Sequence, residues 1–407
     1  MESIGENIAR IRRRRGLTQQ ELAERSGVSI GVIRKLERSE RDTATLATLG
    51  RLAAALDVTT VDLFRPAPRF DVIVDDTADR DDLFGLRRAL QPPRTLDPLS
   101  GLQLADGEQP PTLEAVRESA RQVVRGFRES DYAGTVAMLP QAIAEARRAA
   151  ATLAGDDQAA AWAQLAEILQ TAGMVLTQLR RYDLAYHAIG LAMDAARHAG
   201  DPVKVAAAVN CENWLLTRQG RFDEAEAGSL RTAEAIEPSL TRAPRSHVAV
   251  WGWLNLGAAA AAARNARRDV ADDAMRRARA AAEVSAPYAD GDTAHWTQFT
   301  PAVVAMREVE LAVVMGDVGR ALEIAPRVPD DARPRVTYQR FQLDLVAAHL
   351  DARMRDEALV RLVRLSRTAP GWLRHQTYAR SLARRLARSW RAIPGDLRAV
   401  LDLLEVS

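Results

Sequence analysis

Apolar residues recur at helical spacing over the first 65 residues of the chain. They return every three or four positions, which is the spacing of one face of an α-helix. Start and stop signals interrupt this pattern, so it predicts five short helices packed on a common core. The apolar positions are Ile4, Ile8, Ile11, Leu22, Ile33, Leu36, Leu49, Leu52, Ala53 and Leu56.

The signals that separate these helices have a defined chemistry. The run Thr18–Glu21 (Thr-Gln-Gln-Glu) is a capping box, in which a side chain and a backbone N–H at each end satisfy each other, so it predicts a helix start. Gly27 is expected to end that helix, and Ser29 to cap the next one. Either Asp42 or Thr43 is expected to cap the fourth helix.

The pattern changes between residues 68 and 111. This stretch carries 5 basic and 9 acidic side chains, and prolines at position 68 and again from position 92 onward exclude one long helix across it. We expect an acidic, Pro-rich linker with one short helix near Asp82–Leu90.

From residue 112 to 407 a turn signature recurs along an almost entirely helical pattern. Its alanines are separated by 40, 46, 50 and 37 residues. Such a period predicts an α-solenoid of stacked helical hairpins, in which a small side chain at each crossing lets two helices approach closely. The copies are Arg181–Ala185, Arg221–Ala225, a weaker Arg268–Ala271, Asp317–Ala321 and Met354–Ala358.

Composition and charge agree with an all-α, two-part chain. Ala, Leu, Arg and Glu are strong helix formers, and they are abundant here. Residues 1–67 hold 12 basic and 9 acidic side chains, a net charge of +3 that suits a phosphate-backbone partner. The single Cys211 excludes an internal disulfide. The longest apolar run, Val248–Ala263, is too short for a bilayer span, so we expect a cytoplasmic protein with no membrane partner.

The segment 16–37 carries the most specific signal. Its apolar side chains define one shared inner face for two helices joined by a tight turn at Gly27. Ile30, Gly31, Arg34 and Lys35 are left on the outer face of the second helix. A helix with a basic outer face matches the width of the DNA major groove.

This segment resembles the Cro/C1-type (XRE family) helix-turn-helix over residues 4–64, including a fourth helix in Thr45–Val58. The resemblance implies a five-helix, lambda-repressor-like domain that binds double-stranded DNA. It places Ile30, Gly31 and Lys35 at base-contacting positions, with Arg34 beside them. An Ile at such a position suits a thymine methyl, while Lys and Arg suit guanine.

The same resemblance assigns further roles. Arg12 and Glu37 match an ion pair between the first and third helices. Gln19 would hold a phosphate at the N-terminus of the second helix. The remaining DNA-contacting residues that it implies are Thr18, Ser29, Arg38 and Arg41. The alternative is a helical module that has lost DNA binding and serves only as a protein contact. The arginines at positions 12–15 could form a nucleic-acid patch, but we expect them to be the solvated last turn of the first helix, with Arg12 turned inward to Glu37.

The repeats resemble tetratricopeptide repeats over residues 112–365, and the whole arrangement is similar to Gram-positive peptide-responsive regulators. A solenoid has a concave face that the first helix of each hairpin lines. Amide and indole side chains suit a peptide or small ligand there, although they equally suit packing between repeats. The expected effector-binding residues are Asn210, Asn213, Trp214, Trp251 and Asn255, with Trp253 nearby.

The sequence therefore predicts three parts: a DNA-binding domain (1–67), the linker (68–111) and a repeat domain (112–407). The hypothesis is a homodimeric bacterial transcription regulator whose repeats sense a peptide or small ligand and mediate dimerisation. The alternative is a regulator whose repeats bind a partner protein while the head only localises the complex.

No enzyme, metal or cofactor is expected. The run Gly27–Gly31 matches a nucleophile elbow, but that motif requires a strand before it, and here helices flank both sides. The six histidines lack metal-ligand spacing, and no phosphate-binding glycine loop is present.

Overall fold

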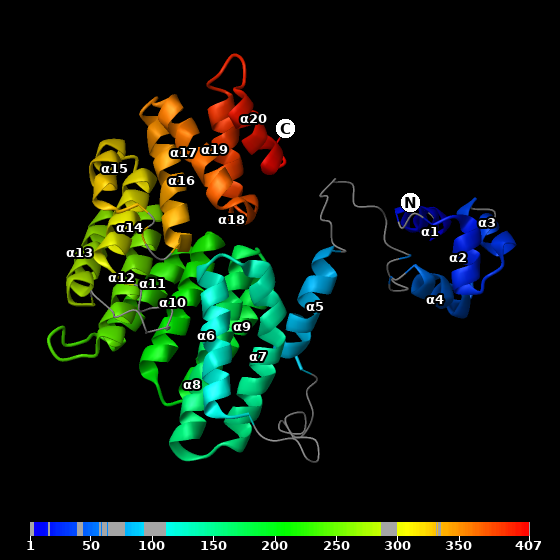
Figure 1. The fold of residues 1–407 in the computed structure, drawn as a ribbon, viewed down its shortest axis with the longest axis horizontal. Coiled ribbons are helices and arrows are strands. Elements are labelled where there is room, and N and C mark those ends of the chain that lie inside the picture. Colours follow the sequence, from blue (N-terminus) through cyan, green and yellow to red (C-terminus); the bar gives the residue numbers. More distant parts are fainter. Residues whose placement is uncertain are drawn as a thin grey trace. The chain divides into compact units, whose positions relative to one another are not determined.

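The computed structural model describes residues 4–14, 17–38, 44–56, 58, 63, 78–92, 111–285, 299–330, 332 and 335–406. Within these residues every regular element is helical, which confirms the all-α class. The chain forms two compact units, residues 1–76 and 77–407 (Figure 1).

The first unit contains four described helices around a small apolar core. They are α1 (Ile4–Arg14), α2 (Gln19–Ser26), α3 (Ile30–Glu37) and α4 (Leu46–Ala55). The expected fifth helical turn lies outside the described residues, apart from Leu63, which is buried. The core is built from the apolar positions of the sequence pattern: Ile8, Leu22, Ile33, Leu36, Leu49, Leu52, Ala53 and Leu56 are all buried, and Ile4 and Ile11 pack against them.

The local signals in this unit fold mostly as expected. The Thr18 Oγ1 accepts a hydrogen bond from the Glu21 N–H (3.2 Å), and the Thr18 N–H donates to Glu21 Oε2 (2.7 Å), which completes the capping box. Gly27 ends α2 in the left-handed conformation (φ 62°). Ser29 holds the N-cap position of α3, but its side chain makes no capping bond.

The expected cap of α4 was wrong. Thr45 starts this helix, and its Oγ1 accepts from the Thr48 N–H (3.2 Å). Asp42 and Thr43 lie outside the described residues. Thr45, two residues after Thr43, provides the capping chemistry that was expected of Asp42 or Thr43.

The second unit begins with α5 (Ala78–Leu90), which contacts α7 and α9. Arg147 donates to the carbonyl of Ala89, and a ring nitrogen of His187 lies 3.1 Å from the carbonyl of Leu90. These two side chains satisfy carbonyls in the last turn of α5, where the helix has no internal donors. The short helix expected within the linker is thus part of the repeat unit.

Helical hairpins follow, and the first helix of each contacts the first helix of the next, which forms an inner layer of α6, α8, α10, α12, α14 and α16 (Figure 1). The hairpins are α6 (Leu113–Arg128) with α7 (Tyr132–Thr152), α8 (Gly155–Gln178) with α9 (Tyr182–His198), α10 (Pro202–Arg218) with α11 (Phe222–Ala235), α12 (Arg245–Arg264) with α13 (Arg268–Ser285), α14 (Pro301–Val314) with α15 (Val318–Ile324), and α16 (Arg335–Asp351) with α17 (Arg355–Thr368). The short η3 (Ala325–Arg327) follows α15, and α18 (Pro370–Arg374), α19 (Thr377–Ala387) and α20 (Gly395–Leu403) complete the unit.

One turn geometry joins the two helices of all six hairpins. A left-handed residue follows the inner helix, and the next N–H donates to a carbonyl five residues back, as in Arg181 to Leu176 (2.8 Å) and Asp317 to Ala312 (2.8 Å). This is the Schellman arrangement, which satisfies the last carbonyls of the inner helix. The left-handed residues are Ser130, Arg180, Gly220, Ala266, Gly316 and Arg353.

The recurring turn signature is confirmed, including its weak copy. Its alanines (Ala185, Ala225, Ala271, Ala321 and Ala358) are fully buried. A sixth copy at Asp131–Thr135 escaped the sequence pattern because Thr135 takes the place of the alanine.

The stack curls until its last helices meet its first ones. The Gln376 Nε2 donates to Gln178 Oε1 (3.3 Å), and the Ser130 hydroxyl donates to Gln339 Oε1 (3.4 Å). One apolar cluster also joins buried residues of α8 and α10 to those of α16–α20. The inner layer therefore surrounds a central cavity.

A pair of glycine variants tests the turn geometry. A Cβ added at Gly316 (φ 76°) or at Gly190 in α9 meets no atom within 4 Å, so only the backbone distinguishes the two sites. We expect Gly316→Ala to lower the free energy of unfolding by about 1 kcal/mol and Gly190→Ala to raise it by about 0.5–1 kcal/mol. Urea denaturation of the two variants measures both changes, and equal effects would contradict the turn assignment.

Candidate DNA-binding surface and repeat-domain cavity

The outer face of α3 is open to solvent. Gly31, Arg34 and Lys35 are exposed, and Ile30 is half-buried. The opposite face carries Ile33 (0% exposed), which anchors the helix in the core. The structure thus places the four outer-face residues of the sequence analysis on one accessible surface.

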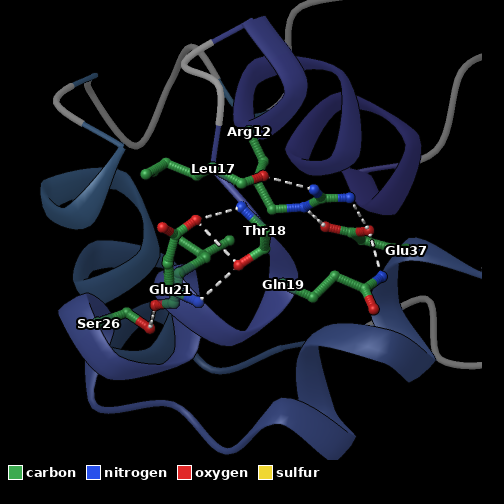
Figure 2. A network of polar contacts seen from close by, with 8 residues as sticks. Arg12, Leu17, Thr18, Gln19, Glu21, Ser26 and Glu37 are labelled. Atoms are coloured by element: carbon green, nitrogen blue, oxygen red, sulfur yellow. Dashed lines mark hydrogen bonds and ion pairs between the residues drawn. The ribbon is translucent and has the colours of Figure 1, made fainter.

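A buried carboxylate, Glu37, holds this helix in place (Figure 2). Arg12 Nε donates to Glu37 Oε1 (2.7 Å) and Arg12 Nη2 to Glu37 Oε2 (2.8 Å), so the pair is bidentate. Arg12 Nη1 also donates to the carbonyl of Leu17 (2.7 Å). The side chains of Arg12 and Glu37 are only 11% and 6% exposed. The hydrogen bonds that Arg12 donates to Glu37 raise the pKa of Arg12. The expected pair between α1 and α3 is confirmed.

Gln19 is engaged within the protein. Its Nε2 donates to Glu37 Oε2 (2.7 Å), so the side chain expected to contact a phosphate is held against α3 (Figure 2). One amide hydrogen takes part in this bond, and the other is left for an external acceptor. Glu37 therefore joins α1, the start of α2 and the end of α3 through a single carboxylate.

Gly5 is a structural residue that the sequence analysis missed. A Cβ at this position would lie 1.7 Å from the carbonyl oxygen of Leu36, so α1 can cross α3 here only with glycine. An isolated glycine inside an apolar helical pattern was the available signal.

The other residues that the sequence analysis expects to contact DNA lie around α3, except for one. Thr18 and Ser29 are exposed at the starts of α2 and α3, and Arg38 is exposed after α3. Arg41 lies outside the described residues. Arg34 and Lys35 make no ion pair within the part of the chain that the structure describes, so their charges are available to a partner.

The second feature is a cavity of about 330 Å³ inside the repeat unit. Helices α6, α8, α10, α12, α14, α16 and α18 all contribute to its wall. On α10 the lining residues Asn210, Trp214 and Arg218 are spaced by four, which puts them on one stripe of the helix. Trp253 of α12 and Trp372 of α18 add apolar surface.

Only part of the expected effector-binding set lines this cavity. Asn210 and Trp214 do. Asn213 is buried against α11, where a Cβ on Gly228 would lie 2.6 Å from its Oδ1. Trp251 and Asn255 lie on the side of α12 that faces away from the cavity, and both are also buried.

Within α12 the Asn255 Nδ2 donates to the carbonyl of Trp251 (2.8 Å). Both residues are about half a turn away from Trp253, which faces the cavity. Asn213, Trp251 and Asn255 thus pack between helices, which was the alternative interpretation, and Trp253 belongs to the cavity set.

The cavity wall is rich in arginine. Its lining contains Arg128, Arg218, Arg264, Arg307 and Arg340 but only one acid, Glu310. Arg264 Nη2 and Arg307 Nη1 lie 2.7 and 2.5 Å from the Glu310 carboxylate. Burial alone would raise the pKa of Glu310, but these two guanidinium groups outweigh burial and lower it.

Two further features limit the chemistry of the repeat unit. Burial raises the pKa of Cys211 to about 12, so this thiol is not reactive near neutral pH. Among the described residues no three His, Cys, Asp or Glu side chains are placed to hold a metal ion, and no helix there is long and apolar enough to cross a bilayer.

The Helix-turn-helix family profile matches residues 8–63. A protein of Sinorhizobium fredii named "Uncharacterized HTH-type transcriptional regulator y4dJ" is 48% identical over 63 residues, which is 16% of this chain and 80% of that protein.

Among solved structures, the crystal structure of Bacillus thuringiensis PlcR in complex with the peptide PapR7 and DNA aligns with 87% of this chain and 99% of its own, at 13% identity and a TM-score of 0.31. The match to the Sinorhizobium protein covers most of that relative's length. Through its first unit, this chain belongs to the helix-turn-helix transcriptional regulators.

Proposed function

We propose that the chain is a sequence-specific regulator that binds double-stranded DNA through α3 and answers to a ligand in its repeat unit. The main support for this proposal is the outer face of α3. Arg34 and Lys35 are exposed on this face, while Glu37 anchors the helix to the rest of the unit. Such a helix fits the major groove with its base-contacting side chains already oriented.

Within the groove, Ile30 and Gly31 face the bases at the start of α3, and Lys35 reaches them one turn later. Gly31 has no side chain to separate the helix backbone from the bases. Lys35 and Arg34 donate to guanine N7 and O6. Gln19, Thr18, Ser29 and Arg38 surround this strip and supply phosphate contacts, which set the position of the helix on the duplex.

The ligand part of the proposal depends on the cavity. Its volume of about 330 Å³ suits a small molecule or the end of a short peptide rather than a folded protein. We propose that two copies of the chain bind half-sites about one helical turn, roughly 34 Å, apart in a bacterial cytoplasm. Ligand binding would then change DNA affinity by favouring one arrangement of the chain over another.

Lys35 and Gln19 separate base contact from phosphate contact. We expect Lys35→Ala to relax the preferred sequence and to weaken the best site by about 1–3 kcal/mol, because one direct base contact is lost. Gln19→Ala should weaken all sequences about equally. Genome-wide mapping of bound DNA supplies the sites, and fluorescence anisotropy measures the affinities. Unchanged preference in Lys35→Ala would contradict the proposed surface.

Gly31 tests whether the α3 backbone approaches DNA. A Cβ at Gly31 or at Gly50 of α4 meets no protein atom within 4 Å, so either alanine should stabilise its helix by about 1 kcal/mol. Gly31→Ala should nevertheless lose DNA affinity, because the methyl group would stand between helix and bases, whereas Gly50→Ala should keep it. Equal DNA affinity in the two variants would place this part of α3 outside the groove.

Glu37→Gln tests the anchor of α3. The substitution leaves the nearly buried Arg12 guanidinium without its charge partner, so the first unit should lose about 3 kcal/mol of stability. DNA binding should fall with it. Limited proteolysis and anisotropy measure the two effects, and Glu24→Gln on the exposed side of α2 is the control. Full DNA binding by a stable Glu37→Gln protein would remove Glu37 from this role.

A further inference from the structure

The guanidinium of Arg218 in the cavity has no acidic partner among the described residues. Arg264 and Arg307 bond to Glu310, and Arg340 Nε lies 3.1 and 3.2 Å from the two carboxylate oxygens of Asp344. Arg218 makes no ion pair or hydrogen bond among the described residues, and its guanidinium carbon lies 5.6 Å from the ring centre of Trp214. The cavity wall therefore holds more positive than negative charge.

The position of Arg218 in its helix does not explain why a cation that lacks an acidic partner in the described part of the chain lies there. It is the last residue of α10, where the helix dipole favours a cation, and Arg264 ends α12 in the same way. Arg264 uses that position, since its Nη1 donates to the carbonyl of Ala260 (2.8 Å). Arg218 makes no such bond. Burial lowers its pKa, and the nearby Arg340 lowers it further, so the group is both desolvated and repelled.

The other lining residues indicate the chemistry of the rest of the ligand. Trp214 and Trp253 present apolar rings, and Asn210 adds an amide without a hydrogen-bond partner among the described residues. Asn210 and Arg218 lie on one stripe of α10, roughly 12 Å apart at 1.5 Å per residue, with Trp214 between them. A ligand lying along this stripe would meet an amide, an aromatic surface and a cation in order.

We propose that the cavity binds a compact ligand with one acidic group on an apolar or aromatic body. Its acid pairs with Arg218, and its body packs against Trp214 and Trp253. Because this inference names the chemical class of the effector, it rests on the proposed ligand response. A carboxylate that accepts two bonds from a guanidinium would satisfy donors that the protein leaves unused. The acid can belong to a free organic acid or to the C-terminus of a short peptide.

The test uses the full chain and two matched dyes. 1-Anilinonaphthalene-8-sulfonate carries an acidic group, and N-phenyl-1-naphthylamine has the same aromatic body without it. We expect the sulfonate dye to bind the wild-type chain with enhanced fluorescence, and Arg218→Gln to raise its Kd about tenfold or more. The neutral dye should be insensitive to this substitution. Arg231→Gln, an exposed arginine on α11, is the control and should leave both Kd values unchanged.

Competition identifies the source of the acid. Indole-3-acetate and indole-3-acetamide form one pair, and the tripeptide Ala-Leu-Trp with a free or amidated C-terminus forms the other. Displacement of the dye by only the indole acid points to a free organic acid, and displacement by only the free-acid peptide points to a peptide end. If neither acid displaces the dye better than its amide, or if Arg218→Gln binds the sulfonate dye as well as wild type, the inference is overturned.

A second variant protects the test against misfolding. Arg218→Lys keeps the charge but not the two-pronged geometry, so it should bind the sulfonate dye with intermediate affinity. Circular dichroism verifies that each variant folds, and if Arg218→Gln does not, wild-type affinity in Arg218→Lys overturns the two-pronged pairing of the acid with Arg218. The dye measurements contain no DNA. Selective acid binding without any change in DNA affinity would therefore refute the proposed ligand response and leave the cavity assignment standing.

Discussion

The repeat unit depends on the turn that joins the two helices of each hairpin. A single left-handed residue reverses the chain, and its two backbone bonds satisfy the last carbonyls of the inner helix. The next helix then returns along the first, and fully buried alanines let the two approach closely. Because the turn geometry is the same six times, every inner helix enters the same layer. Arg128, Arg218 and Arg264, each the last residue of its inner helix, consequently meet at one cavity.

The first unit depends on a carboxylate rather than on a turn. Glu37 receives hydrogen bonds from two residues on other segments of the chain, which fixes α3 relative to α1 and α2. A unit with so small a core has little apolar contact with which to orient an eight-residue helix. A nearly buried, fully bonded ion pair provides this orientation because its geometry is directional. The outer face of α3 is then free to carry only side chains that serve recognition.

The two sites use arginine in different ways. The guanidinium of Arg12 is neutralised by a carboxylate and stabilises the fold. The same is true of Arg264, Arg307 and Arg340 in the repeat unit. At Arg34 and Arg218 the positive charge is left unpaired among the described residues, on an exposed helix face in one case and inside a cavity in the other. In the proposed function these unpaired charges are where each unit would meet a negatively charged partner, since pairing within the protein would remove that capacity.

The sequence by itself determined the features that rest on neighbours a few residues apart. The capping box at Thr18, the left-handed Gly27 and the inner and outer faces of α3 follow from short-range spacing, and so does the recurring hairpin turn. The tertiary structure alone decided which face of a long helix is turned inward. Helix α12 is buried nearly all round, so no polar side marks its orientation, and Trp251 and Trp253 are equivalent in sequence terms. Packing against α10, α13 and α14 placed Trp253 in the cavity and Trp251 in the core, because a helix in a stack takes the rotation that its neighbours leave available.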